Sequence, residues 1–184
     1  MNTDRILVTY ATRTGSTRGV AEAIGAVLAE SGVAVDVRPM REVSDLTAYS
    51  AVVAGSAIQA KQWLPEALDF VRTNRMALSR RPFAAFLVCM TLAMRQGESY
   101  RGFVSDFMRP VRAMVRPVSE GLFAGSLDIS RMPSLFDRLQ FQISVWAGVW
   151  SPGDHRDWEA IRAWARDVHP RLVIGAPAQT MAQA

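Results

Sequence analysis

The feature that most constrains the fold is the stretch from Ile6 to Ala26, where an apolar run passes through a hydroxyl-rich turn into a helix-forming segment. Residues 12–17 read TRTGST, and apolar side chains then recur at spacings of three and four from Val20 onward. This order predicts a strand, a tight loop and a helix. The free N–H groups of the first helical turn and the positive end of the helix dipole would face the loop. The sequence therefore predicts an anion-binding loop.

The side chains of this loop suit a terminal phosphate. Four of its positions have hydroxyls that can donate hydrogen bonds: Thr12, Thr14, Ser16 and Thr17. Gly15 allows close approach of the backbone, but no lysine follows it as in GxxxxGK[ST], and a single glycine excludes GxGxxG. A mononucleotide phosphate is the better prediction. The alternative is an ordinary helix cap, with Ser16 or Thr17 as the N-cap and no ligand.

Length and composition predict one globular domain. The chain has 184 residues, of which 49% are hydrophobic and 21% are charged. Its formal net charge is +4, and Lys61 is the only lysine, so nearly all cations are arginines. This excess favours an anionic ligand, nucleic acid or an anionic membrane surface, although an arginine-rich genome would give the same composition. Because aromatic residues interleaved with basic ones are not evident, we expect no nucleic-acid partner.

Several classes of site and location are not expected. A single cysteine, Cys89, excludes an internal disulfide, and His155 and His169 lack the spacing of metal ligands, so no metal is expected. The N-terminus lacks the pattern of a signal peptide, and no apolar run approaches the roughly 20 residues of a spanning helix. We expect a cytoplasmic protein whose contact with a membrane, if it has one, is peripheral at the inner face of the cell membrane.

Predicted strands and helices alternate along the rest of the chain. Apolar or alternating runs predict further strands at residues 33–37, 51–56, 83–90 and 121–127. Amphipathic patterns predict helices at residues 63–76, 99–114 and 157–168. Five strands with intervening helices imply an α/β fold with a doubly wound parallel sheet, whose ligand lies at the carboxyl ends of the strands. We expect this domain to span residues 1–170, followed by a flexible tail at 171–184.

The first loop also resembles that of a known family. TRTGST is similar to the flavodoxin phosphate loop [ST]-x-T-G-x-T, which holds the phosphate of FMN, and this resemblance implies strand order 2-1-3-4-5. More specifically, the chain resembles the menaquinone-dependent protoporphyrinogen IX dehydrogenases of the flavodoxin superfamily. The resemblance also rests on GSAI at residues 55–58, FAGSL at 123–127, DWE at 157–159, and an extra segment before the last helix.

The resemblance implies FMN as the cofactor and assigns residues to it. The phosphate would be held by Thr12, Arg13, Thr14, Gly15, Ser16 and Thr17. The flavin ring would lie between two loops, formed by Ser56, Ala57, Ile58 and Gln59 and by Thr91, Leu92, Ala93 and Met94. The usual stacking aromatics are missing from the tight part of both loops. Trp63 is either a substitute for them or a core residue of a helix.

The extra segment, residues 133–150, reads PSLFDRLQFQISVWAGVW. On a helix, one apolar side would consist of Leu135, Phe136, Leu139, Ile143, Trp146 and Trp150. Such an aromatic-rich side is typical of helices that lie in a membrane interface, where a lipid-soluble quinone would be met. Packing on its own domain or on a second subunit is an equal alternative, and a homo-oligomer remains open.

The resemblance implies an FMN-dependent, quinone-linked oxidoreductase acting on a porphyrinogen-like substrate. The flavin would carry the chemistry, so no side chain is expected to be catalytic. The substrate's propionates would suit four arginines: Arg95, Arg101, Arg109 and Arg112. One alternative is a flavodoxin-type electron carrier, against which the basic charge counts because such carriers are typically acidic. The other is a flavin-free flavodoxin-like subunit of a membrane complex.

Overall fold

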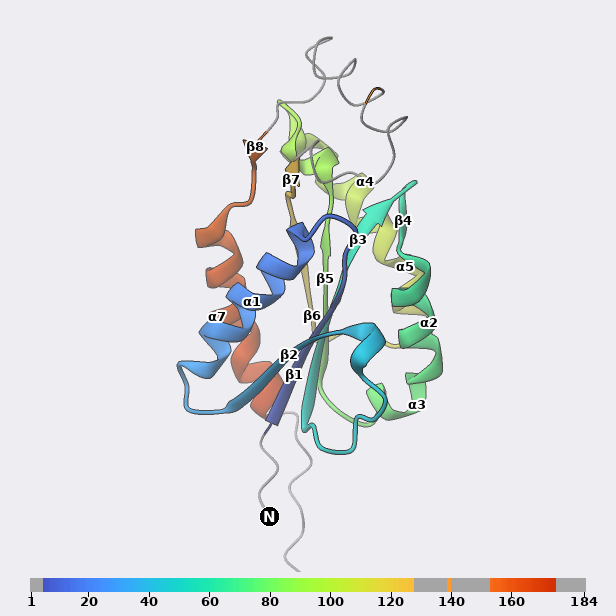
Figure 1. The fold of residues 1–184 in the computed structure, drawn as a ribbon, viewed down its shortest axis with the longest axis vertical. Coiled ribbons are helices and arrows are strands. Elements are labelled where there is room, and N and C mark those ends of the chain that lie inside the picture. Colours follow the sequence, from blue (N-terminus) through green and yellow to red (C-terminus); the bar gives the residue numbers. More distant parts are fainter. Residues whose placement is uncertain (1–4, 128–138, 140–152, 175–184) are drawn as a thin grey trace, which may run out of the picture.

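The computed structural model describes residues 5–127, 139 and 153–174, and they form an α/β fold (Figure 1). Five parallel strands make the body of the sheet: β1 (Arg5–Ala11), β2 (Ala34–Pro39), β3 (Ala51–Gln59), β5 (Phe83–Val88) and β6 (Ser119–Phe123). Their order is β2-β1-β3-β5-β6, and a two-residue strand, β4 (Gln62–Trp63), pairs with the end of β3. The five main strands therefore lie in the predicted order 2-1-3-4-5, which confirms the fold class.

The apolar runs form the centre of the sheet. All six residues of β5 are buried, and so are the first six residues of β3. Val8 of β1 lies between Val37 of β2 and Val53 of β3 in the parallel register. Strands that are covered on both faces need continuous apolar sequence, which is why these segments were recognisable.

Helices cover both faces of the sheet (Figure 1). One face packs against α1 (Ser16–Ala29) and α7 (Trp158–Ile174), and the other against α2 (Pro65–Thr73), α3 (Arg75–Leu78), α4 (Arg101–Ser105) and α5 (Arg109–Met114). Each face has its own hydrophobic core. Ile24, Phe86 and Ile161 belong to the first core, and Leu87 and Val111 to the second.

The predicted helix at 63–76 begins two residues later than expected and is divided. Trp63 lies in β4, Leu64 is the N-cap of α2, and Pro65 is its first residue. Proline suits this position because it has no N–H to donate. The helix stops at Asn74, after which α3 begins. Trp63 is 1% exposed and belongs to the core, which settles its role as a core residue.

A single helix at 99–114 is wrong. The segment consists of four short pieces, α4, α5 and the 3-10 turns η3 (Gly97–Tyr100) and η4 (Asp106–Met108). Pro110 lies at the start of α5 and cannot donate a hydrogen bond to the carbonyl of Asp106, which breaks a continuous helix at this point. The amphipathic pattern remains because the pieces share one buried side, with Val104, Met108 and Val111 in the core.

The predicted fifth strand and last helix also have different ends. β6 ends at Phe123, and Ser126–Leu127 form a separate strand, β7, which pairs antiparallel with β8 (Gly153–Asp154) on the other side of residues 128–152. α7 continues beyond residue 168 and through Pro170 to Ile174. Buried Leu172 joins the core of that face, which offsets the hydrogen bond lost at the proline. The expected domain boundary at 170 thus falls inside α7.

The extra segment is mostly outside the described residues, as are Leu135, Phe136, Ile143, Trp146 and Trp150. Leu139 is described, and it is 57% exposed. In the part of the chain that the structure describes, no helix combines the length and the apolar character needed to cross a membrane.

Candidate functional site

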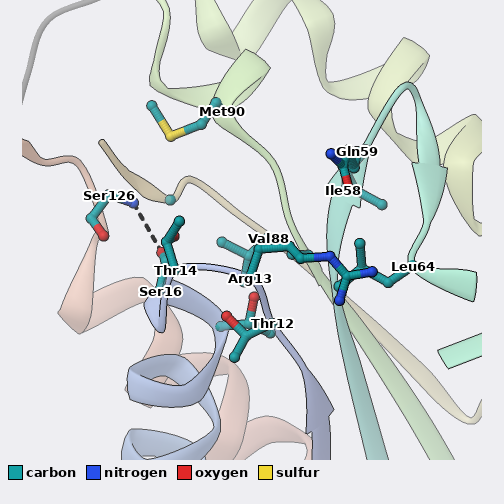
Figure 2. A pocket seen from close by; sticks show the side chains of 13 residues that line it. Thr12, Arg13, Thr14, Ser16, Ile58, Gln59, Leu64, Val88, Met90 and Ser126 are labelled. Atoms are coloured by element: carbon teal, nitrogen blue, oxygen red, sulfur yellow. Dashed lines mark hydrogen bonds between the residues drawn. The ribbon is translucent and has the colours of Figure 1, made fainter. Parts of the chain in front are cut away.

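A cavity of about 250 Å³ lies at the carboxyl ends of the central strands (Figure 2). The loops after β1 and β3 meet here, where the chain changes direction across the sheet, which is the usual ligand position in this type of fold. The lining residues lie at or near the carboxyl ends of β1, β3, β5 and β6: Thr12, Arg13, Thr14, Ser16, Thr17, Ala57, Ile58, Gln59, Leu64, Val88, Met90, Gly125 and Ser126. The phosphate end is polar, and the opposite end is mostly apolar.

Gly15 shapes the polar end. It is the N-cap of α1 and has a φ of 92°, in the left-handed region that favours glycine. Its N–H donates a hydrogen bond to Thr12 Oγ1 at 3.1 Å. The alternative in which Ser16 or Thr17 is the N-cap is therefore wrong, since both lie inside the helix. Their hydroxyls are not used as caps and remain near the cavity.

The hydroxyls of the loop retain hydrogens that they can donate. Thr12 Oγ1 accepts from the N–H of Gly15, and Ser16 Oγ accepts from the N–H of Ser126 at 2.9 Å (Figure 2). Neither hydroxyl donates a hydrogen bond to another described residue, so each can donate to a ligand. Thr17 is fully buried, and its Oγ1 has no partner among the described residues. A buried, unpaired hydroxyl is destabilising unless something completes its hydrogen bond. A phosphate needs donors, so the residues present fit the phosphate of FMN.

Arg13 lines the cavity but is already paired. Its guanidinium donates two hydrogen bonds to Glu66 in the first turn of α2, and Nη2 lies 3.0 Å from Oε2 (the other contact is Nη1 to Oε1). The hydrogen bond from Arg13 lowers the pKa of the Glu66 carboxyl. This pair joins the phosphate loop to α2 beside the cavity. The charge of Arg13, which we assigned to the phosphate, is balanced by Glu66 in this arrangement.

Ser56 supports the site without lining it. Its buried hydroxyl donates to the carbonyl of Ala57 at 2.8 Å and accepts from the N–H of Leu64 at 3.0 Å. These bonds fix the end of β3 relative to the start of α2. Ala57, Ile58 and Gln59, which follow Ser56, do line the cavity as expected.

The residues that form the opposite wall of the cavity come slightly earlier in the sequence than expected. Val88 and Met90 line the cavity, whereas the predicted set does not: Thr91, Leu92, Ala93 and Met94. These four residues are half-buried in and directly after the 3-10 turn η2 (Met90–Ala93). The turn packs closely on Gly97, where an added Cβ would lie 2.1 Å from the carbonyl oxygen of Leu92. This contact holds the turn near the cavity without placing its later side chains in it.

Gly125 and Ser126 are site residues that the predicted set lacked. An added Cβ at Gly125 would lie 3.1 Å from Met90 Sδ and 3.4 Å from Ser16 Oγ, so this glycine allows three loops to meet closely. Ser126 binds Ser16 from a position 110 residues away. A signal was present, because both belong to the FAGSL match.

Arg156, which follows β8 of the two-stranded β7–β8 sheet, connects that strand to Ser16 at the start of α1. Its Nε and Nη2 each donate to Asp154 at 2.7 Å, and its Nη1 donates to the carbonyl of Ser16 at 3.3 Å. Its guanidinium also lies 4.3 Å from the ring centroid of Trp158. The hydrogen bond from Arg156 lowers the pKa of Asp154. Both β7 and the residues after β8 are thus bonded to Ser16.

Three of the four arginines predicted to bind substrate form ion pairs within the protein. Arg101 pairs with Glu98 at 3.2 Å, Arg109 with Asp106 at 2.9 Å, and Arg112 with Glu120. Arg95 is exposed, and no ion pair links it to any residue that the structure describes. None of the four lines the cavity.

Comparisons with known proteins agree with this geometry. A family model for the flavodoxin domain matches residues 7–149. The protoporphyrinogen IX dehydrogenase [quinone] of Escherichia coli (strain K12) is 24% identical over 176 residues, covering 89% of this chain and 94% of that protein.

Solved structures show the same fold. An archaeal flavodoxin superposes with a TM-score of 0.53 and 18% identity, covering 92% of this chain and 99% of the flavodoxin. A short-chain flavodoxin associated with a bacterial microcompartment gives a TM-score of 0.54 and 18% identity, with 94% and 98% coverage.

Proposed function

The chain belongs to the flavodoxin-domain family, and on this premise we propose that it is a quinone-linked oxidoreductase of the protoporphyrinogen IX dehydrogenase type. It would take electrons from a porphyrinogen-like substrate through FMN and pass them to a quinone. Support for this choice over other flavodoxin-like proteins comes from the E. coli relative, whose similarity extends over 94% of its length. The net charge of +4 also favours an anionic substrate. It counts against an electron carrier, because such carriers are typically acidic and dock on basic partners.

Flavodoxin domains bind FMN, so the family confirms the predicted cofactor. The observation that carries the site assignment is the set of free hydroxyl donors around the N-terminus of α1, above all the buried Thr17 hydroxyl. Thr12, Thr14, Ser16 and Thr17 would hold the phosphate. Ala57 to Gln59 and Met90 would flank the ring, and Leu64 and Val88 would keep water away from it. When bound, the flavin supplies hydride acceptance at N5 and electron transfer to the acceptor.

A flavodoxin-type electron carrier is the second candidate, because the solved structures with this fold include flavodoxins. A carrier would exchange electrons with protein partners and leave a porphyrinogen unchanged. The family's cofactor counts against the other alternative, a flavin-free subunit of a membrane complex.

Anaerobic mixing of the FMN-loaded protein with protoporphyrinogen IX tests the proposal. We expect the absorbance of oxidised flavin to bleach and then to recover when a menaquinone analogue is added. The matched control is a Gly15→Val variant prepared in the same way, which should lack the flavin and give no signal. If the flavin of the wild type is not reduced by the porphyrinogen but is reduced by a reducing flavoprotein, the protein is an electron carrier and not a dehydrogenase.

We also propose a peripheral contact with the membrane, where a lipid-soluble quinone is available. The proposal rests on the sequence of residues 133–150. A variant lacking residues 135–150 should float less with liposomes that contain menaquinone and should reduce the quinone more slowly, with unchanged FMN content. Equal flotation and equal rates would limit the segment to a structural role.

A further inference from the structure

The β3–β4 hairpin forms one rim of the cavity and has an unusual turn. Ile58 pairs with Trp63 and Gln59 with Gln62, which leaves Ala60 and Lys61 as a two-residue turn. Both have positive φ, 49° and 63°, although neither is glycine. Such turns favour Asn-Gly or Gly-Gly, and a left-handed backbone with side chains is strained. The chain therefore keeps two side chains at the rim despite the strain.

One of these side chains is the only lysine of the protein. Lys61 is exposed, and its Nζ lies 5.8 Å from the ring centroid of Phe103 in α4. No carboxylate among the described residues forms an ion pair with it, whereas nearby Arg101 and Arg109 are paired with Glu98 and Asp106. An exposed aromatic face balances an ammonium only weakly. Lys61 is thus a cation that a carboxylate ligand would pair with better.

Two aromatic side chains at the start of α4 are exposed, and Phe103, the one that contacts Lys61, is held by packing. Phe103 is 47% exposed and Tyr100 is 40% exposed, which is unusual for side chains of this size. The ring of Phe103 packs edge-on against the buried ring of Phe107, with centroids 5.0 Å apart at 75°. This contact fixes one edge of Phe103 and leaves the remainder of the ring available to a ligand.

These residues connect the two walls of the flavin cavity. Gln59 lines the cavity two residues before Lys61, and Met90 lines it at the start of η2, which contacts α4. The contact between Lys61 and Phe103 therefore joins the hairpin to the helix that follows the opposite wall. A ligand on this surface would lie beside the apolar end of the cavity, where the flavin ring is expected.

We propose that Lys61, Phe103 and Tyr100 form the substrate subsite, which binds a ring of linked pyrroles that carries a carboxylate. The aromatic side chains contact the ring, and the flexible stem of Lys61 lets its ammonium leave Phe103 and bind the carboxylate. This inference rests on the proposed function and names the part of the site that would recognise a tetrapyrrole. It differs from the prediction that arginines bind the propionates, because three of those arginines already have carboxylate partners.

Binding of protoporphyrin IX and of its dimethyl ester to the FMN-loaded full-length protein tests the subsite. Fluorescence titration gives a Kd for each ligand, and the ester keeps the ring but lacks both charges. Lys61→Gln should raise the Kd of the acid about fivefold and leave that of the ester unchanged. Phe103→Ala should raise both Kd values about tenfold.

The matched control is Arg80→Gln. It removes an exposed positive charge just before the start of β5, whereas the cavity lies at the end of that strand. It should change neither Kd. Equal effects of Lys61→Gln on acid and ester, or no effect of either rim variant, would overturn the subsite. If wild-type protein is still bleached by protoporphyrinogen in that case, the proposed function stands. If the wild type neither binds the porphyrin nor bleaches, the proposed function fails, and the subsite fails with it.

Discussion

The two ends of the cavity are built in different ways. At the phosphate end, Ser16 is bonded to both Ser126 and Arg156, and Gly15 is fixed in a left-handed conformation. At the other end, where we propose that the flavin ring lies, Ile58 and Met90 line the cavity with apolar side chains (Figure 2). On the proposed assignment, recognition of the cofactor would be concentrated at its phosphate. The apolar end would then leave its outer rim available to a substrate.

The largest effect that tests this contrast should come from Gly15→Val. The left-handed φ of 92° is strained for a β-branched residue, so the phosphate loop must change shape. We expect the affinity for FMN to fall about a hundredfold, since strain of this kind is worth about 1–3 kcal/mol. Quenching of flavin fluorescence on binding measures this loss.

The control for this variant is Gly32→Val, which places the same strain in the turn between α1 and β2. Gly32 has a φ of 83° and open space around it. Both variants should lose stability, but only Gly15→Val should lose FMN. If Gly32→Val lost FMN equally, general unfolding would explain both results, and the phosphate end would have no special role.

Thr17→Val should separate binding from folding. The variant removes a buried hydroxyl that has no partner in the described structure, so the FMN-free protein should become more stable by about 1 kcal/mol. FMN should bind about tenfold more weakly, because one donor to the phosphate is lost. Thermal unfolding without FMN measures the gain in stability, and a binding titration measures the loss of FMN affinity.

The chain offers a matched control in Thr9→Val. Thr9 is also fully buried, and its Oγ1 has no partner in the part of the chain that the structure describes, but it lies within β1 and does not line the cavity. This variant should gain similar stability and keep its affinity for FMN. Equal binding by the Thr17 and Thr9 variants would show that the Thr17 hydroxyl does not contact the phosphate.

Arg156→Gln should have a smaller effect that is specific to the phosphate end. It removes the bond to the carbonyl of Ser16 and the bonds to Asp154, which pairs with Ser126 across the β7–β8 ladder. FMN affinity should fall about fivefold, whereas riboflavin, which lacks the phosphate, should bind as before. Arg166→Gln, on the exposed side of α7, is the control and should change neither. An equal loss for both ligands would mean that Arg156 only supports the fold.

The sequence predicted the strand, loop and helix at residues 5–29 better than the other walls of the cavity, and for a physical reason. Strand, loop, glycine and helix are adjacent in the chain, so Thr12 to Thr17 could be recognised locally. For Ser126 the only signal was the FAGSL resemblance, because its local sequence does not show that it reaches Ser16 across 110 residues. The pairing of Arg112 with Glu120 could not be predicted locally either, because the two side chains meet only after α5 and β6 pack together. Apolar runs predicted the sheet because burial on both faces requires them.

The smallest predicted effect concerns the pair that joins the phosphate end to α2. Glu66→Gln removes the charge that balances Arg13. Because both side chains are partly exposed, solvent screening limits the loss of stability at pH 7 to about 0.5 kcal/mol. The freed guanidinium can then pair with the phosphate, so FMN should bind about threefold more tightly.

The pH dependence of stability checks the same pair. Arg13 lowers the pKa of Glu66 from 4.5, so the folded state releases this proton more readily than the unfolded state. The stabilisation is therefore fully present above the unfolded pKa and is lost as the pH falls through the lowered folded value. The free energies of unfolding of wild type and Glu66→Gln should differ at neutral pH and converge in acid. The control for FMN affinity is Asp69→Asn, on the same helix, which should leave FMN binding unchanged. If Glu66→Gln weakened FMN binding instead, Glu66 would be positioning Arg13 for the phosphate. Neutralisation of Arg13 by Glu66 would then not limit FMN affinity.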